Sequence, residues 1–169
     1  MSVTLRLPRA IAEEIERRAS EAGVSIEEYL LDITTRDIDP VTAAEKYIVS
    51  AQQLLDEAAN GLAKGNLRQA SEKIWGACAL AVKAHALAKK GTRLESHRDL
   101  WVYKNEIAKE LGGWVRIAFK LADSMHRNFY EDWATREDVE DVLKEVERLV
   151  RAIAESIERS TSERPGTKS

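Results

Sequence analysis

His126, Arg127 and Asn128 are consecutive and combine side chains that could act on a phosphodiester. Histidine exchanges a proton near neutral pH, so His126 could serve as a general acid or base. The Arg127 guanidinium could steady negative charge on a phosphate. Consecutive side chains on a helix diverge by about 100°, however. His126 and Arg127 are therefore poorly placed to hold one phosphate, unless a second copy of the chain supplies one of them.

His126 also fits a packing role. At helical spacing it shares an apolar face with Val115, Phe119, Ala122, Phe129 and Trp133. A histidine on such a face is more often a hydrogen-bonded core residue than a catalyst. Arg127 lies four residues from both Asp123 and Glu131, as in a surface ion pair.

The other reactive residues form no recognisable site. His85 and His97 belong to different predicted helices without paired ligands nearby, which gives no support for a metal site. The single cysteine, Cys78, excludes an intrachain disulfide, and packing is its expected role in an apolar helix. The chain has no glycine-rich phosphate loop, nucleophile elbow or paired-carboxylate motif. We therefore predict no metal and no cofactor.

The composition is that of a protein with mixed surface charge. Charged residues make up 33% of the 169 residues and the formal net charge is −3. A protein that contacts nucleic acid over much of its surface would be expected to carry a net positive charge. No apolar run approaches the roughly 18 residues that a membrane span needs, and no signal peptide precedes the first predicted element. We predict a cytoplasmic protein without a membrane partner.

Residues 2–7 alternate polar and apolar side chains, which is typical of a half-buried strand. One face would carry Val3, Leu5 and Leu7, and the other Ser2, Thr4 and Arg6. A lone strand leaves its backbone N–H and C=O groups unpaired and is not stable. We expect the same strand of a second copy to pair with it. The chain is then a homodimer with the apolar face at its interface.

Two short helices are expected after this strand. Pro8 suits a first helical position, since its φ is already set and it has no N–H to lose. Gly23 suits the end of the first helix, and Ser25 begins a capping box with Glu28 for the second. The segment LRLPRAIAEEIERRASEAGVSIEEYLLDI resembles the ribbon-helix-helix family. That resemblance implies an antitoxin-like DNA-binding dimer in which Ser2, Thr4 and Arg6 read the major groove.

The charge of this region argues against DNA binding. Residues 1–40 contain five Arg, no Lys and nine Asp or Glu, a net charge of −4. DNA affinity depends on neutralising phosphates. A DNA-binding module and a dimerisation module without a DNA role both remain open, and any DNA binding should be weak and lost with salt.

Long helices are expected beyond Asp39-Pro40. Apolar residues recur every three or four positions over 41–62 and 67–88, on either side of Gly65-Asn66. Two such segments indicate an antiparallel helical hairpin with close packing. Three more helices are expected, from Ser96 to Leu111, from Trp114 to Trp133 and after Thr135. We predict a mainly α fold with a strand and two helices in 1–38, an antiparallel bundle of about five helices in 41–158 and a disordered tail in 159–169.

Three segments of the predicted bundle resemble the HEPN superfamily of helical bundles: NLRQASEKIWGACALAVKAHALAKKG, LESHRDLWVYKNEIAKELG and DSMHRNFYEDW. They are more closely similar to the PaREP family of crenarchaeal proteins, a family of unknown function. The resemblance covers about residues 41–150. Many HEPN proteins are ribonucleases or toxins, whereas others are inactive binding or scaffold modules.

The HEPN nuclease signature is an Arg, usually followed by a polar residue, with a His about six positions further on. Arg127 and Asn128 match its start, but Asp132 and Trp133 stand where the His is expected, and no His follows Arg127. The chain is therefore expected to lack ribonuclease activity. The exception would be a composite site in which His126 acts with Arg127 and Asn128.

Three functions follow from these patterns. The first is a dimeric, non-catalytic HEPN-like interaction module associated with DNA or RNA. The second is a ribbon-helix-helix-type regulator similar to an antitoxin, with a cognate toxin or antitoxin as a protein partner. The third is a divergent HEPN ribonuclease or toxin. We favour the first, because it accounts for the predicted strand, the bundle and the incomplete motif.

Overall fold

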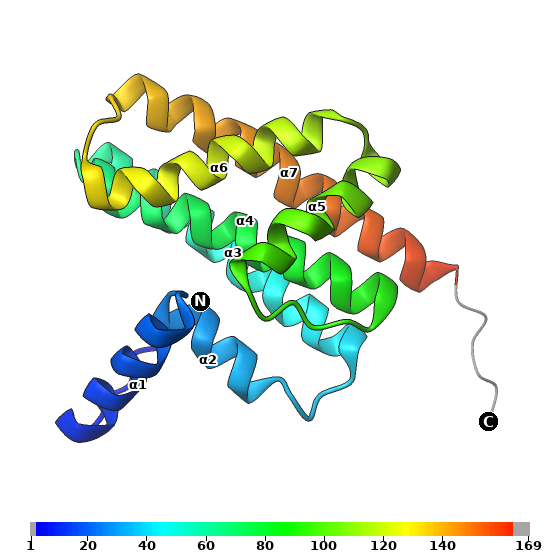
Figure 1. Ribbon diagram of the computed structural model, residues 1–169, viewed down its shortest axis with the longest axis horizontal. Coiled ribbons are helices and arrows are strands. Elements are labelled where there is room, and N and C mark those ends of the chain that lie inside the picture. Colours follow the sequence, from blue (N-terminus) through cyan, green and yellow to red (C-terminus); the bar gives the residue numbers. More distant parts are fainter. Residues whose placement is uncertain (1–2, 164–169) are drawn as a thin grey trace. The chain divides into compact units, whose positions relative to one another are not determined.

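The computed structural model describes residues 3–163, which contain seven helices (Figure 1). The chain divides into two compact units, Met1–Asp37 and Ile38–Ser169. The mainly α prediction is confirmed. None of the described helices combines the length and the apolar character that crossing a bilayer requires.

The first unit contains α1 (Arg9–Ala22) and α2 (Ile26–Thr34). Gly23 ends α1 with a φ of 70°, in the left-handed region that favours glycine. The Ser25 side chain caps α2 by accepting the Glu28 N–H at 3.1 Å. Pro8 directly precedes α1 as its N-cap, one position before the one expected. Local end signals thus account for both helices.

The predicted strand is wrong. Residues 3–7 are neither strand nor helix, and no strand occurs anywhere in residues 3–163. A strand needs a neighbour for its backbone hydrogen bonds, and the described chain offers none, so alternation alone does not produce one. The ribbon-helix-helix-like fold is therefore not supported. Val3 and Leu5 remain 81% and 77% exposed.

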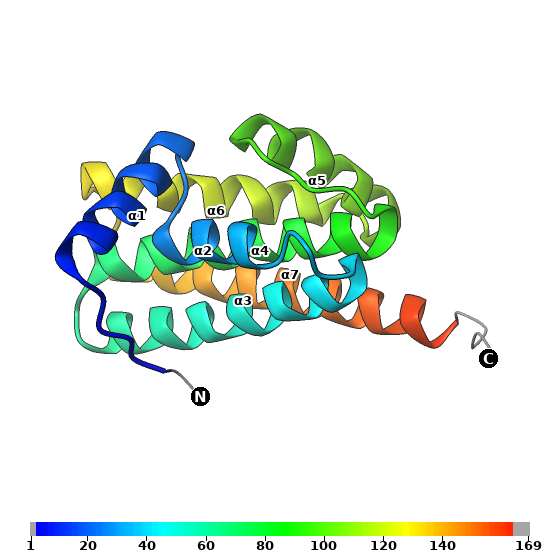
Figure 2. The same cartoon turned by 90° about the horizontal axis from the view of Figure 1, so that it is seen from below.

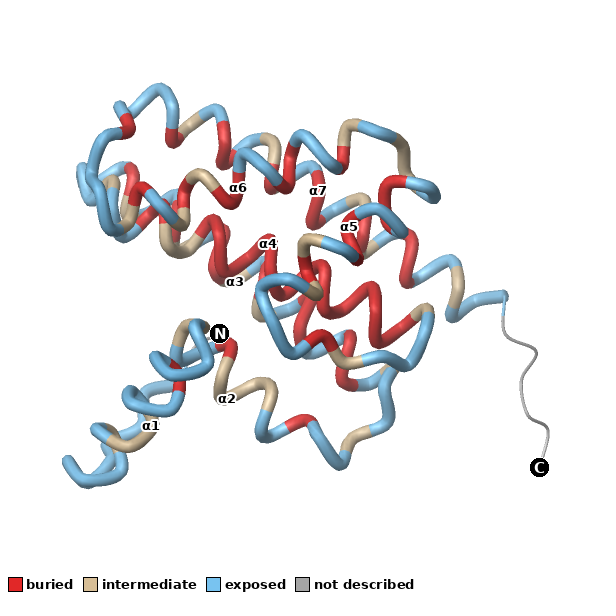
Figure 3. The backbone as a smooth tube through the Cα atoms, viewed as in Figure 1, coloured by how far each residue is buried: buried red, intermediate tan, exposed pale blue. Residues whose placement is uncertain are grey.

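The second unit is a bundle of five helices. They are α3 (Pro40–Ala63), α4 (Leu67–Lys90), α5 (His97–Leu111), α6 (Trp114–Glu131) and α7 (Arg136–Ser162). Helix α4 is central and packs against each of the other four, as Figures 1 and 2 show. Every residue from Ile74 to Ala88 is buried, which Figure 3 shows as a continuous run along α4.

The predicted hairpin is present as α3 and α4. Gly65 allows the tight turn between them with a φ of 78°. A Cβ atom at Gly76 would lie 3.1 Å from Leu54 Cδ1, so the missing side chain lets α4 approach α3 closely. Cys78 is fully buried in α4, and burial raises the pKa of its thiol, in keeping with a packing role.

The last two helices differ from expectation at their C-terminal ends. Helix α6 ends at Glu131 rather than at Trp133, because Asp132 takes a left-handed conformation with a φ of 53°. Helix α7 continues to Ser162, so a disordered tail beginning at 159 is wrong for 159–162. Its apolar stripe extends to the buried Ile157, which anchors this last part of the helix. Residues 164–169 lie outside the described residues.

Candidate functional site

A band of rings, which we call the aromatic band, crosses α4, α5 and α6. It consists of Trp101, His97, His126, Tyr130 and Phe129, with Trp75 beside both histidines and Arg68 at one end. Successive ring centroids from Trp101 to Phe129 are 6.4, 6.2, 5.5 and 5.0 Å apart. The Arg68 guanidinium carbon lies 5.6 Å from the Phe129 ring. The series of contacts is unbroken from α5 to the start of α4.

Helical spacing explains why these side chains share one surface. Residues three or four positions apart lie on the same face of a helix. Such spacings separate Phe119, Asp123, His126 and Tyr130 on α6, Arg68, Glu72 and Trp75 on α4, and His97 and Trp101 on α5. Since α5 and α6 both pack on α4, the three faces meet.

His97 lies at the start of α5 between two polar groups. The Trp101 indole donates its Nε1–H to His97 Nε2 at 2.9 Å. Asp123 Oδ1 lies 3.1 Å from the same nitrogen. The Arg127 guanidinium is 3.8 Å from Asp123 Oδ2, and its side chain is 67% exposed. Asp123 thus links the histidine of α5 to the arginine of α6.

His126 lies beside a second carboxylate. Its Nδ1 atom is 3.6 Å from Glu72 Oε2, too long for a normal hydrogen bond but within ion-pair distance if the imidazole is protonated. Both side chains are about one quarter exposed. The Trp75 indole packs against His126 and His97 with centroid distances of 5.5 and 5.3 Å. Both imidazoles therefore pack against the same apolar ring.

The structure brings His126 together with His97, a residue that sequence reasoning set aside. Arg127 contacts Asp123 as expected for an ion pair four residues apart, and it reaches the histidines only through that carboxylate. No sequence spacing relates position 97 to position 126, because the two residues lie on different helices. The only local signal was the four-residue spacing of His97 and Trp101.

Asn128 has a structural role. It is completely buried, and its Oδ1 accepts the backbone N–H groups of Trp133 and Ala134 at 2.8 and 2.7 Å. Its Nδ2 donates to Ser71 Oγ. Asn128 therefore holds the turn after α6 against α4 and cannot meet a substrate in solvent.

The residues predicted to read DNA belong to the first unit. Thr4 and Arg6 are exposed in the irregular segment before α1. Ser2 lies outside the described residues.

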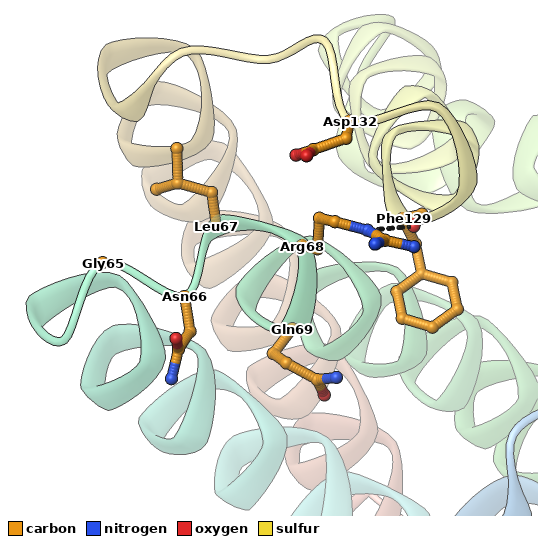
Figure 4. Close-up of a pocket in the computed structure, with 7 residues that line it drawn as sticks. All are labelled: Gly65, Asn66, Leu67, Arg68, Gln69, Phe129 and Asp132. Carbon is orange, nitrogen blue, oxygen red and sulfur yellow. Dashed lines mark hydrogen bonds between the residues drawn. The ribbon is translucent and has the colours of Figure 1, made fainter.

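A pocket of about 450 Å³ opens at the Arg68 end of the aromatic band (Figure 4). Its lining comprises Gly65, Asn66, Leu67, Arg68, Gln69, Phe129 and Asp132. Arg68 Nε donates to the Phe129 carbonyl at 2.8 Å, which fixes the guanidinium over the ring. The band thus continues into a hollow between the start of α4 and the end of α6.

Positive charge also lies beneath the other end of the band. The Lys104 ammonium is 4.3 Å from the Trp101 ring centroid and 5.4 Å from that of Phe119. Burial lowers the pKa of Lys104, and nearby Lys120 and Arg116 add to this effect. A cation at these distances is attracted to the face of an aromatic ring.

A separate polar network joins α4, α5 and α7. His85 Nδ1 and Nε2 lie 3.0 Å from Tyr103 Oη and 3.0 Å from Glu110 Oε2. Lys89 donates to Glu110 Oε1 at 3.1 Å, and Ser156 Oγ donates to the same oxygen. Because Ser156 points at the carboxylate and not at the imidazole, this network is not a nucleophilic triad. Within residues 3–163, no group of three His, Cys, Asp or Glu could hold a metal ion.

Comparisons place the bundle among archaeal proteins. A crystal structure of a protein from Sulfolobus solfataricus superposes with a TM-score of 0.58 at 25% sequence identity, covering 64% of this chain and 96% of that one. No curated protein matches the chain. Residues 46–150, which include every residue of the aromatic band, match the archaeal PaREP1/PaREP8 family. The match spans more than half of the sequence, and the chain therefore belongs to the archaeal PaREP1/PaREP8 family.

Proposed function

We propose that the protein is a non-catalytic interaction module of HEPN-like character that binds single-stranded nucleic acid along the aromatic band. The observation that carries this proposal is the unbroken series of rings from Trp101 to Phe129, which ends at Arg68. Proteins that bind single strands without sequence preference combine stacking rings with cations along the backbone path. The band offers both.

The exposure of the band supports stacking as the main source of affinity. Tyr130 is 67% exposed, while its ring is held edge-on by His126 and Phe129. A ring fixed by its neighbours loses little conformational freedom when a base stacks on it. Stacking contributes about 1–3 kcal/mol per base and is tolerant of sequence. We expect similar affinity for RNA and DNA single strands and much weaker affinity for duplexes.

The charges of the band support only a moderate electrostatic contribution. Arg68 and Arg127 are exposed, whereas Asp123 and Glu72 place carboxylates beside the histidines. Each neutralised phosphate of a single strand contributes about −0.7 to the slope of log K against log salt. Two arginine contacts therefore give a slope of about −1.4, far below that of a highly basic binder.

Fluorescence anisotropy with labelled oligonucleotides tests the proposal. Tyr130→Ala should weaken binding of single-stranded RNA about tenfold, whereas Tyr130→Phe, which keeps the ring, should bind as the parent does. Arg127→Ala should weaken binding and make the salt slope shallower. Arg151→Ala, which removes an exposed arginine of α7, is the matched control. Equal affinity of the Tyr130→Ala variant and the parent would rule out binding on this surface.

A ribonuclease is the second candidate function, and the His97–His126 pair favours it. The imidazole centroids are 6.2 Å apart and both side chains are partly exposed. One imidazole could take a proton from a 2′-hydroxyl while the other protonates the leaving oxygen. Against this reading, His97 is already engaged by Trp101 and Asp123.

We also infer that a second copy of the chain covers Val3, Leu5 and Leu7. These side chains alternate along one segment and are 81%, 77% and 47% exposed. Apolar side chains gathered in one exposed segment favour burial against a partner. A symmetric dimer is the commonest way in which a protein covers such a surface.

A further inference from the structure

One nitrogen of His97 lies within hydrogen-bond distance of both a donor and an acceptor. Trp101 presents an N–H at 2.9 Å from Nε2, and Asp123 presents a carboxylate oxygen at 3.1 Å. An indole nitrogen can only donate and an ionised carboxylate can only accept. Nε2 accepts from Trp101 only when it carries no proton, and it donates to Asp123 only when it carries one. Neither protonation state satisfies both neighbours.

We propose that His97 is a proton-controlled switch that couples its own protonation to the binding of a phosphodiester group at the α5 end of the aromatic band. This inference rests on the proposed function for the identity of the ligand. In the neutral tautomer that carries its proton on Nδ1, Nε2 accepts from Trp101 while its lone pair also faces Asp123. In the other neutral tautomer, Nε2 carries the proton and cannot accept from Trp101. In the protonated state, Nε2 donates to Asp123 and the Trp101 N–H loses its acceptor.

A phosphodiester is the ligand that this second state fits. The released Trp101 N–H needs an acceptor, and a phosphate oxygen can supply one. The Arg127 guanidinium, 3.8 Å from Asp123 and largely exposed, is a charged donor on the same surface. The protonated imidazole adds a positive charge beside Asp123. Protonation thus breaks the hydrogen bond between Trp101 and His97. It leaves the Trp101 N–H free to donate on the same surface as the Arg127 guanidinium.

Charged and titratable groups on α4, α5 and α6 surround the imidazole of His97. The charged or titratable groups around His97 are Asp123, Arg127 and His126 on α6, Glu72 beside His126 on α4, and Lys104 on α5. The carboxylates favour the imidazolium, whereas Arg127 and Lys104 oppose it. His97 is also the first residue of α5, where the helix dipole disfavours a cation. Asp99, although in the same turn, is occupied by the N–H groups of Glu95 and Ser96.

Side-chain NMR of the full chain tests the switch without any ligand. Long-range proton–nitrogen spectra recorded across pH report the pKa and the tautomer of each imidazole. Trp101→Phe removes the donor that stabilises neutral His97 and should raise its pKa. Asp123→Asn removes the acceptor that stabilises the imidazolium and should lower it. His85, which contacts Tyr103 and Glu110 instead, is the internal control and should titrate as in the parent.

Dimethyl phosphate is the probe for the ligand, because its single charge does not change between pH 6 and pH 8. Its affinity, followed by the Trp101 indole N–H resonance, should be on the order of tenfold higher at pH 6 than at pH 8 when protonation drives binding. The His97→Gln variant should lose this pH dependence. Binding should in turn raise the pKa of His97.

The outcomes separate the switch from the proposed function. Opposite pKa shifts in Trp101→Phe and Asp123→Asn, together with pH-dependent binding of the probe, support the switch. Shifts in the same direction, or no shift in either variant, overturn it, and so does equal or absent binding of dimethyl phosphate at both pH values. Oligonucleotide binding that is independent of pH but sensitive to Tyr130→Ala would overturn the switch alone. Opposite shifts without any oligonucleotide binding would overturn the proposed function alone.

Discussion

Asn128 on α6 donates to Ser71 on α4 at 2.8 Å, and both residues are completely buried. Glu72 and Trp75 follow Ser71 on α4, and His126 and Tyr130 flank Asn128 on α6. This hydrogen bond therefore fixes the register of the two helices at the centre of the aromatic band. Ser71 Oγ itself donates to Leu67 O at 2.8 Å, which ties the pair to the first turn of α4.

Asn128→Ala should destabilise the protein by about 2–4 kcal/mol. The change leaves the buried N–H of Ala134 and the part-buried N–H of Trp133 without their acceptor, and each unsatisfied buried group costs about 1–3 kcal/mol. Ser71→Ala leaves one buried donor, the Asn128 Nδ2–H, without its acceptor and should cost about 1–3 kcal/mol. Urea denaturation gives both free energies of unfolding. An Asn128→Ala variant as stable as the parent would show that these hydrogen bonds contribute nothing.

The His85–Glu110 network predicts that stability falls in acid. Burial lowers the pKa of His85, although the hydrogen bond to Glu110 acts in the opposite direction. The unfolded chain then binds a proton more readily than the folded one. The stability from His85 is present above its unfolded pKa of about 6.5 and is lost as the pH falls below it. The free energy of unfolding should start to decline near pH 6.5.

Glu110 adds a second decline at lower pH. Burial would raise its pKa, but hydrogen bonds from Ser156, Lys89 and His85 outweigh burial and lower it to about 2. Its stabilisation is present above the unfolded value of about 4.5 and is lost as the pH falls towards 2. Glu110→Gln should remove this part of the pH dependence, whereas Glu155→Gln, at an exposed position of α7, should keep it. A Glu110→Gln variant with the parent's acid profile would contradict the assignment.

Leu5→Glu should weaken self-association. Sedimentation at micromolar concentration should give a dimer for the parent chain and a larger monomer fraction for the variant, because a charge replaces an apolar contact. Thr4→Glu adds the same charge at the neighbouring exposed position without replacing an apolar side chain, and it should leave the dimer intact. A parent chain that sediments as a monomer would refute the dimer.

Purified protein should not cleave RNA. His97 Nε2 is occupied by Trp101 and Asp123, and Arg127 reaches the imidazoles only through Asp123. Incubation with a labelled RNA strand should leave it intact at pH 6 and pH 8. Cleavage that disappears in both His97→Gln and His126→Gln, with the fold unchanged, would establish the ribonuclease instead. Cleavage that survives both changes would point to a contaminant.

The helices were largely predictable because their ends are set locally. Ser96 and Asp99 form the expected capping box, in which the Asp99 N–H donates to Ser96 Oγ at 3.1 Å. Gly23 and Gly91 end their helices in the left-handed conformation. Each signal involves residues within a few positions of one another, so the sequence alone contains the information.

The strand and the paired histidines were not predictable in the same way. The alternation of residues 2–7 suits a strand, but a strand also needs a second strand for its backbone hydrogen bonds. The described chain contains no such partner strand. His97 and His126 meet because α5 and α6 both pack on α4 beside Trp75. That meeting depends on how the helices cross, which no periodicity along the chain encodes. The burial of Asn128 is also a consequence of this packing.

Photocrosslinking tests the central claim most directly. A single-stranded RNA containing 4-thiouridine is bound to the protein and irradiated, and the crosslinked peptides are identified by mass spectrometry. Binding along the aromatic band predicts crosslinks at Trp101, at Tyr130 and in the segment 65–75, which includes Arg68 and Trp75. At an RNA concentration near the parent's Kd, these crosslinks should be strongly reduced in Tyr130→Ala and unchanged in Tyr130→Phe. Crosslinks confined to α1 or α7, or none at all, would contradict the account.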